Sequence, residues 1–328
     1  MATLLIILCP PRSFSSVVAT MIGQHPELYG FPELQLFSDE SMDTLLIRRE
    51  KRGKAAPAGL ARFIAQEVFG IQNARTALQA IDWIRERRSW STKQMLDYAI
   101  DLVAPKIGVE KSPGTSSRFS YMERAARDYP DAYFLHLTRH PVSARQGIEE
   151  FFGSKAERAR RHGSEAVTKE KPLLREAFDS LILWHHMHTA ILRFTNGLPA
   201  GTTMRVKGED LLSDPDRYLA QIAEWMGLRT DAEAIACMKH PEESPYAYTG
   251  PRPISGGNDR KFMCNPRLRT GRVREPSLEA FVRDCGWSYA SQEFKAELAG
   301  HPATVDLGIS DDAMLEEVRA VTHLLGYQ

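Results

Sequence analysis

Residues 3–16 read TLLIILCPPRSFSS and are followed by a helical pattern of apolar residues. The first half of this stretch is an unbroken apolar run rich in Leu and Ile, typical of a strand that is buried on both faces. A strand, a polar loop and a helix in this order predict an anion site, because backbone N–H groups and the helix dipole face the loop. The Arg12 guanidinium and the hydroxyls of Ser13, Ser15 and Ser16 would complete such a site.

This loop differs from the loop that binds ATP or GTP. That loop has the pattern G-x-x-x-x-G-K-[ST], whereas residues 9–16 contain neither Gly nor Lys. A simpler interpretation is that the three serines cap the first helix. On the residues alone, both interpretations stay open.

A carboxylate in an apolar setting follows the first helix, within Phe31-Pro32-Glu33-Leu34. A carboxylate near an anion site is a candidate general base, which suggests a group-transfer enzyme. Glu27 is a second candidate, although its position beside Pro26 is typical of a surface loop.

The segment PPRSFSSVV followed by a carboxylate resembles the 5′-phosphosulfate loop of sulfotransferases that use 3′-phosphoadenosine 5′-phosphosulfate (PAPS), usually P-[KR]-S-G-[ST]-[ST]. Three further segments resemble that family and occur in its order. They are VEKSP at 109–113, YFLHLTRHPV at 133–142 and RVKGEDLLSDP at 205–215. The resemblance extends from residue 4 to about residue 227 and is closest in layout to bacterial acyl- or polyketide-type and glycan-type sulfotransferases.

The resemblance implies an α/β fold with a mostly parallel sheet flanked by helices, similar to P-loop NTPases, in one sulfotransferase domain over 1–328. The apolar patterns predict strands at 3–9, 106–110, 132–138 and 202–206, and helices at 15–24, 116–128 and 215–226. Residues 39–104 show only helical periodicity, which predicts a helical insertion, either as extra packing or as a lid over the acceptor.

The resemblance also implies roles for individual residues. The catalytic candidates are Glu33 as general base, with Arg12 and Lys111 as positive charges near the transferred group. A structural alternative for Lys111 is a salt bridge to Glu110 or another carboxylate. The candidates for binding PAPS are Arg12, Ser13, Phe14, Ser15, Ser16, Arg139, Ser143, Gly147, Arg260 and Lys261.

Two positions depart from the family pattern. Phe14 stands where the family commonly has Gly, so the loop must form without the backbone freedom of glycine. Gly147 stands eight residues after Arg139, where the family usually has Ser, and Ser143 is the candidate substitute. Arg139 is therefore the main candidate for the 3′-phosphate.

Composition narrows the class of protein further. The chain has 42 Lys plus Arg and 42 Asp plus Glu, so no overall charge favours nucleic acid or a membrane surface. Its four cysteines are scattered, and His185 and His188 lack the partners of a metal site, so no metal is expected. With no signal peptide or membrane span evident in the sequence, a soluble, cytoplasmic protein is expected. The resemblance to polyketide-type sulfotransferases implies a role in secondary metabolism.

The sequence therefore predicts sulfuryl transfer from PAPS to a hydroxyl, with adenosine 3′,5′-bisphosphate (PAP) as product. The helical insertion offers Leu60, Phe63, Ile64, Val68 and Phe69 as lining for an acceptor pocket. We therefore expect a small or lipophilic alcohol, with a carrier-bound acyl chain and its acyl carrier protein among the candidates. The alternatives are a Mg-dependent nucleotide kinase or NTPase and a catalytically inactive PAP-binding member.

Overall fold

The computed structural model describes residues 3–148, 180–269, 271–285 and 311–328. Contacts between Cα atoms divide the chain into two compact units, which are described separately. The first unit consists of Met1–Cys9, Phe14–Leu137 and Ala190–Val273, and the second of Pro10–Ser13, Thr138–Thr189 and Arg274–Gln328. The assignment of 1–328 to one sulfotransferase domain stays a prediction.

A five-stranded sheet in the order β2-β3-β1-β4-β5 lies at the centre of the first unit. β1 pairs in parallel with β3 and with β4, and β2 pairs in parallel with β3, which confirms the expected parallel α/β architecture. The strands are β1 (Leu4–Leu8), β2 (Leu28–Gly30), β3 (Ile107–Glu110), β4 (Tyr133–Thr138) and β5 (Thr203–Lys207). The short β2 is the strand that the apolar pattern did not predict.

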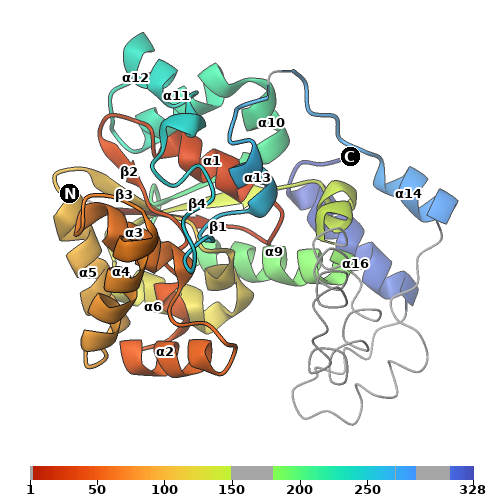
Figure 1. The fold of residues 1–328 in the computed structure, drawn as a ribbon. Helices are drawn as coiled ribbons and strands as arrows, with labels where there is room; N and C mark the ends of the chain where they lie inside the picture. The colour runs from red at the N-terminus through yellow and green to blue at the C-terminus, as the bar shows by residue number, and fades with distance from the viewer. Residues whose placement is uncertain (1–2, 149–179, 270, 286–310) are drawn as a thin grey trace, which may run out of the picture. The chain divides into compact units, whose positions relative to one another are not determined.

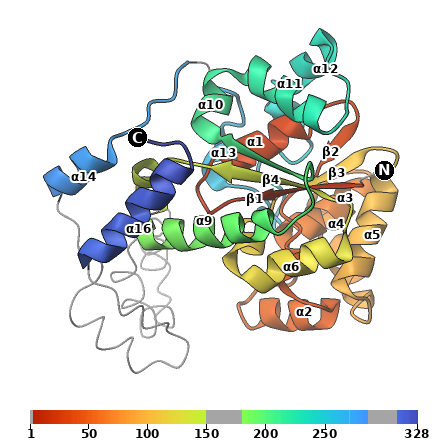
Figure 2. The same cartoon turned by 180° about the vertical axis from the view of Figure 1, so that it is seen from behind.

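The apolar run of β1 is buried on both faces of the sheet, as its composition predicts. Leu4, Ile6 and Leu8 belong to one hydrophobic cluster, whereas Leu5 and Ile7 belong to another, and all five are 0% exposed. On one side of the sheet lie α3 (Ala58–Glu67), α4 (Ala74–Glu86), α5 (Thr92–Val103) and α6 (Phe119–Asp128). On the other side lie α1 (Ser15–Ile22), α10 (Gly208–Ser213) and α11 (Pro215–Trp225), as the two opposite views show (Figure 1, Figure 2). β1 therefore joins two cores.

The predicted insertion is helical throughout its main elements. These are α2 (Met42–Glu50), α3 (Ala58–Glu67), α4 (Ala74–Glu86) and α5 (Thr92–Val103). The Ser91 side chain accepts from the Gln94 N–H and the Gln94 side chain accepts from the Ser91 N–H, a reciprocal cap that begins α5. The lid role of this insertion stays a prediction.

The apolar face of the insertion is used for core packing. Leu60, Phe63 and Ile64 are all 0% exposed and belong to the cluster under β1, and Val68 and Phe69 pack against it. The expectation that Leu60, Phe63 and Ile64 line an acceptor pocket is therefore wrong, because helices this close to the sheet bury their apolar stripe against it.

The three other helices predicted in the first unit, at 15–24, 116–128 and 215–226, are present to within a few residues of these bounds, whereas three further short helices were not predicted. Asp214 accepts from the Arg217 N–H and precedes Pro215, and Gly227 follows the helix with φ +70°. The helices are α1 (Ser15–Ile22), α6 (Phe119–Asp128), α10 (Gly208–Ser213), α11 (Pro215–Trp225), α12 (Ala232–Cys237) and α13 (Arg260–Cys264), with 3-10 turns at Leu36–Ser38, Pro113–Ser117 and Pro241–Glu243.

The second unit is held together around the C-terminal helix. It contains α14 (Leu278–Cys285), α16 (Asp311–Leu324), the first part of α9 (Ser180–Asn196) and the helical residues 141–148. Arg319 of α16 pairs with Glu279 of α14, with Nη2 and Oε2 2.8 Å apart. The Tyr327 hydroxyl lies 2.8 Å from Thr138 Oγ1, and its ring packs edge-on against His140.

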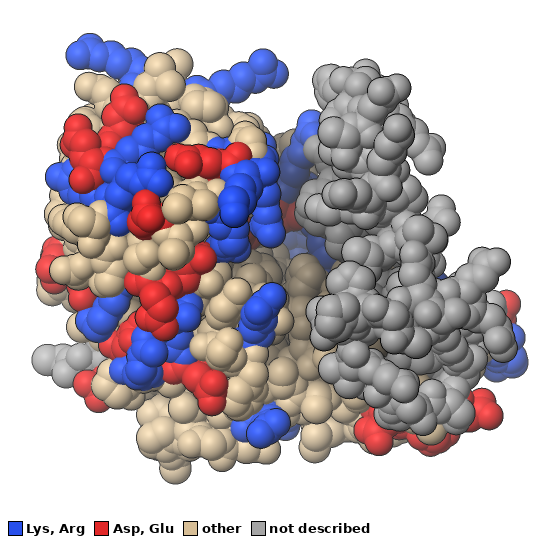
Figure 3. All heavy atoms as spheres, turned by 90° about the horizontal axis from the view of Figure 1, so that it is seen from below, with Lys and Arg blue, Asp and Glu red and all other residues tan. Residues whose placement is uncertain are grey.

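The surface carries both signs of charge. On the face shown in Figure 3, Lys and Arg side chains are interspersed with Asp and Glu side chains, as the equal totals of the two classes suggest. No helix in the described part of the chain combines the length and the apolar character needed to cross a membrane.

A buried carboxyl group ends β3. Glu110 is 1% exposed, Ser112 Oγ donates to its Oε1, and its Oε2 has no hydrogen-bond partner within the described residues. Ser112 Oγ in turn accepts from the Gln35 N–H at 3.0 Å. Burial disfavours the charged carboxylate and raises the pKa of Glu110 to about 7.

This carboxyl predicts a pH dependence of stability. The ordinary pKa of a Glu side chain is 4.5, whereas the pKa of Glu110 in the folded protein is about 7. At pH values between these two, the folded protein binds one proton more than the unfolded chain. The contribution of Glu110 to the free energy of unfolding therefore falls by on the order of 3 kcal/mol as the pH rises through this window. In Glu110→Gln, urea unfolding at pH 5 and pH 8 should lack this fall, so the variant gains stability relative to the parent at pH 8. The exposed Glu123→Gln in α6 is the matched control, and equal pH dependence in Glu110→Gln and the parent would contradict the prediction.

Candidate active site

The order of the strands brings three segments of the chain together at the edge of the sheet formed by the carboxyl ends of the strands. Glu33 follows β2, Lys111 follows β3 and Ser16 lies in the first turn of the helix that follows β1, and these three strands are neighbours. The parallel register pairs Gly30 with Val109 and Ile6 with Glu110. Because parallel strands end at a common edge, residues far apart in sequence meet there.

Two predicted catalytic residues, Glu33 and Lys111, form an ion pair at this edge. Lys111 Nζ lies 2.6 Å from Glu33 Oε1, and the exposed fractions of the two side chains are 1% for Lys111 and 20% for Glu33. The salt-bridge alternative for Lys111 is thus confirmed with Glu33 as the partner. The second carboxylate oxygen, Glu33 Oε2, makes no hydrogen bond with the described residues and belongs to the more exposed partner.

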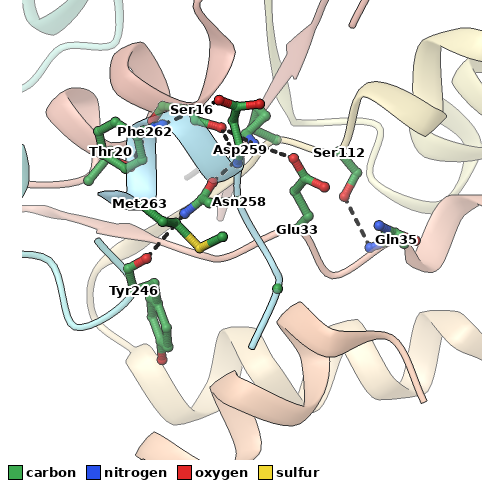
Figure 4. A network of polar contacts seen from close by, with 12 residues as sticks. Ser16, Thr20, Glu33, Gln35, Ser112, Tyr246, Asn258, Asp259, Phe262 and Met263 are labelled. Carbon is green, nitrogen blue, oxygen red and sulfur yellow. Dashed lines mark hydrogen bonds and ion pairs between the residues drawn. The ribbon is translucent and has the colours of Figure 1, made fainter. Parts of the chain in front are cut away.

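Lys111 uses all the hydrogen-bond donors of its ammonium group. An ammonium has three N–H donors, and three acceptors surround this one: Glu33 Oε1, Ser16 Oγ at 3.2 Å and Asn258 Oδ1 at 3.1 Å. Figure 4 shows Glu33, Ser16 and Asn258 converging from separate segments of the chain. A buried ammonium with three acceptors holds these groups at fixed positions.

The backbone around Glu33 is tightly packed. The Glu33 N–H donates to the Gly257 carbonyl at 2.8 Å. A Cβ added at Gly59, in the first turn of α3, would lie 2.1 Å from the Glu33 carbonyl oxygen. Only glycine allows so close an approach, so the helical insertion fixes the backbone that carries Glu33.

The loop before α1 has an unusual backbone. Phe14, at the N-cap of α1, has φ +59° and ψ 9°, and Arg12 has φ +68°, both in the left-handed region. Phe14 therefore adopts, without being glycine, a conformation that favours glycine. Ser15 and Ser16 are buried within α1, and no side-chain hydrogen bond caps the helix. The interpretation of the serines as helix caps is therefore wrong.

The second unit brings together four of the residues predicted to bind the donor. Arg139 Nη1 donates to the Arg12 carbonyl, and Arg139 Nε donates to Ser143 Oγ at 3.1 Å. A Cβ added at Gly147 would lie 3.2 Å from Arg12 Cβ and 3.3 Å from Arg139 Nη1. Trp184 Nε1 donates to the Arg139 carbonyl at 2.8 Å and fixes the main chain there. Ser143 thus contacts the Arg139 side chain, and its role as substitute for the serine of the family pattern stays a prediction.

Other candidates lie away from the Glu33–Lys111 pair. Glu27 precedes β2, at the opposite end of that strand from Glu33, and its exposed carboxylate accepts from the Arg229 N–H. Arg260 and Lys261 begin α13 with exposed side chains, so their role toward the donor stays a prediction. Within the described ranges, no group of three or more His, Cys, Asp or Glu residues could hold a metal ion.

Asn258 is the site residue that the sequence analysis missed. Arg260 and Lys261 were predicted to bind the donor because of their charge, whereas the neutral amide two residues before Arg260 was not considered. Nothing in the spacing shows that a residue 147 positions after Lys111 accepts a hydrogen bond from it. Only the tertiary structure supplies that contact.

Comparison with known proteins identifies the family and finds a similar fold. The model of the sulfotransferase family matches residues 5–232. The sulfotransferase domain from the curacin biosynthetic pathway superposes with a TM-score of 0.65 at 18% identity, covering 100% of this chain and 99% of that chain. The sulfotransferase domain from the olefin synthase of Synechococcus PCC 7002 gives a TM-score of 0.62 at 19% identity, covering 100% of this chain and 96% of that chain. The comparison with curated protein sequences gave no match. Because the family model covers well over half of the chain, this protein belongs to the sulfotransferase family.

Proposed function

We propose that this sulfotransferase transfers a sulfuryl group from PAPS to a hydroxyl group, with Glu33 as general base. The observation that carries the proposal is the Glu33–Lys111 ion pair beside Ser16, at the carboxyl ends of β2, β3 and β1. In parallel α/β sheets, this edge is where ligands bind. When bound, PAPS supplies the sulfuryl group and leaves as PAP.

The loop residues suit a donor that carries phosphate and sulfate groups. In the first unit, α1 begins without a side-chain cap, so its first N–H groups can donate to an anion. In the second unit, Ser13 Oγ is buried and has no hydrogen-bond partner among the described residues. In this proposal, Arg12 and Ser13 to Ser16 bind the phosphosulfate end, and Arg139 and Ser143 bind the 3′-phosphate.

Glu33 has the accessibility that a general base needs. Its Oε1 is occupied by Lys111, whereas its Oε2 makes no hydrogen bond with the described residues. In this proposal, Oε2 accepts the proton of the acceptor hydroxyl as the oxygen attacks sulfur. A positioned base of this kind accelerates such a step by roughly 10²–10⁴-fold.

Lys111 contributes fixed positive charge rather than a free donor. Its three N–H groups are bound to Glu33, Ser16 and Asn258, so its role in the proposal is to hold the base and to add positive charge near the developing negative charge. Fixed charges of this kind need no rearrangement during the reaction.

For the acceptor, we propose a small or lipophilic alcohol, with an acyl chain on an acyl carrier protein as the leading candidate. The support comes from the layout shared with polyketide-type sulfotransferases and from the two similar structures, which are titled as domains of the curacin pathway and of an olefin synthase. Leu60, Phe63 and Ile64 are buried in the core, so the apolar residues of the insertion do not support a lipophilic acceptor.

The first test concerns the base. Glu33→Gln keeps an oxygen for Lys111 but cannot accept a proton, so turnover should fall by at least about 10²-fold with little change in PAP affinity. Turnover with PAPS and calorimetry with PAP measure the two quantities. Glu27→Gln, an exposed carboxylate at the other end of β2, is the control and should retain its turnover. Near-parental turnover in Glu33→Gln would assign the base elsewhere.

The second test concerns the 3′-phosphate. Arg139→Ala should weaken PAP binding by about ten- to hundredfold, because a charge-assisted hydrogen bond is worth roughly 1.5–3 kcal/mol. Binding of an analogue without the 3′-phosphate should change little. Since any loosening of the loop would affect both ligands, the ratio of the two affinities isolates the phosphate contact. The exposed Arg283→Ala of α14 serves as the control, and equal weakening toward both ligands would refute the assignment.

The third test concerns the acceptor. In competition assays with PAPS, β-hydroxyacyl thioesters should be sulfonated in preference to simple phenols and to oligosaccharides. The same hydroxyacyl chain offered on an acyl carrier protein and on a short thiol distinguishes recognition of the carrier from recognition of the chain. A clear preference for oligosaccharides would overturn the acceptor proposal and leave the sulfotransferase activity intact.

A further inference from the structure

Asn258 contributes the one acceptor to Lys111 that comes from outside the recognised motifs. Ser16, Glu33 and Lys111 belong to segments that resemble sulfotransferase motifs, whereas Asn258 lies beyond residue 232, where the family match ends. Its Oδ1 accepts from Lys111 Nζ at 3.1 Å, and its Nδ2 donates to the Tyr246 carbonyl at 3.4 Å. Both the oxygen and the nitrogen of the Asn258 side-chain amide are thus hydrogen-bonded.

The segment that carries Asn258 contacts each partner of the Lys111 ammonium. The Gly257 carbonyl accepts from the Glu33 N–H at 2.8 Å, and the Asp259 N–H donates to Ser16 Oγ at 3.0 Å. Ser16 Oγ therefore interacts with both Lys111 and the main chain of the 256–259 segment. Figure 4 shows this segment passing between Glu33 and Ser16.

The 256–259 segment is fixed from the side of the helical insertion. Gly257 has φ +103°, and a Cβ there would lie 2.9 Å from Gly59 Cα, so glycine permits close contact with the start of α3. The Arg62 side chain of α3 is 2% exposed, and its Nη1 donates to the Gly256 carbonyl at 3.1 Å. A segment anchored in this way can hold Asn258 in one orientation.

We propose that Asn258 is a positioning residue for the sulfuryl transfer, acting through Lys111 on Glu33; this inference rests on the proposed function of Glu33. Without Asn258 Oδ1, one N–H of a buried ammonium has no acceptor, which is costly in the protein interior. The ammonium then moves toward other acceptors and carries Glu33 Oε1 with it. A base displaced by about 1 Å loses much of its rate advantage.

The primary experiment separates rate from binding. Asn258→Leu, which has a similar shape but no polar atoms, should lower kcat about tenfold and leave the PAPS KM and the PAP Kd within about threefold of the parent. The exposed Asn265→Leu, just after α13, is the matched control and should retain the parental kcat. Parental kcat in Asn258→Leu, or a loss confined to KM, would overturn the proposal.

A double-mutant cycle tests whether Asn258 acts through Glu33. In a Glu33→Gln background, Asn258→Leu should reduce the residual kcat by less than about twofold, because the base that it positions is already absent. A purely structural role would still cost about tenfold in that background and would refute the inference.

A second readout does not depend on activity. Lys111→Met and Asn258→Leu should lower the Tm of the PAP-free protein by less in combination than the sum of the two single losses, because each removes one side of the same contact. Additive losses would contradict the contact itself. If Asn258→Leu does not fold, the same cycle is measured with Asn258→Ala.

A parent protein that transfers no sulfuryl group from PAPS would refute the proposed function, whereas an active parent with additive effects would refute only the role of Asn258.

Discussion

The three hydrogen bonds of the Lys111 ammonium are the interactions on which the candidate site depends. They join a helix after β1, a loop after β2 and a segment from the C-terminal third of the chain, all centred on a residue that follows β3. A buried ammonium cannot leave a donor without a partner at low cost, so its position requires all three acceptors. This requirement fixes the position of the Glu33 carboxylate. The negative charge of Glu33 balances the positive charge of the buried Lys111 ammonium.

The helical insertion supports this network through its backbone more than through a binding surface. Its apolar residues fill the core under β1, whereas Gly59 packs against the Glu33 backbone and Arg62 binds the Gly256 carbonyl. Arg62 is surrounded by carbonyl and amide oxygens, and burial lowers its pKa to about 10, so it remains charged at neutral pH. The insertion thus connects core packing to the geometry of the base.

The loop before α1 shows a different use of the backbone. Non-glycine residues in the left-handed region cost roughly 1–2 kcal/mol each, and both Arg12 and Phe14 occupy it. In the second unit, the Arg12 carbonyl accepts from Arg139, so part of this cost is offset by a charge-assisted hydrogen bond. Phe14 therefore occupies the left-handed region although it is not a glycine.

The sequence by itself determined the parallel α/β architecture, the helical insertion and the identity of Glu33, Lys111 and Ser16 as candidates, because apolar periodicity and short motifs are local properties of the chain. It did not determine β2, which is too short for a periodic pattern, or the burial of Leu60 and Phe63, which depends on distance from the sheet. Only the tertiary structure decided that Lys111 pairs with Glu33 and that Asn258 completes the set. These contacts depend on strand order and on the close approach of glycines in separate segments, and neither is encoded in the spacing of any one motif.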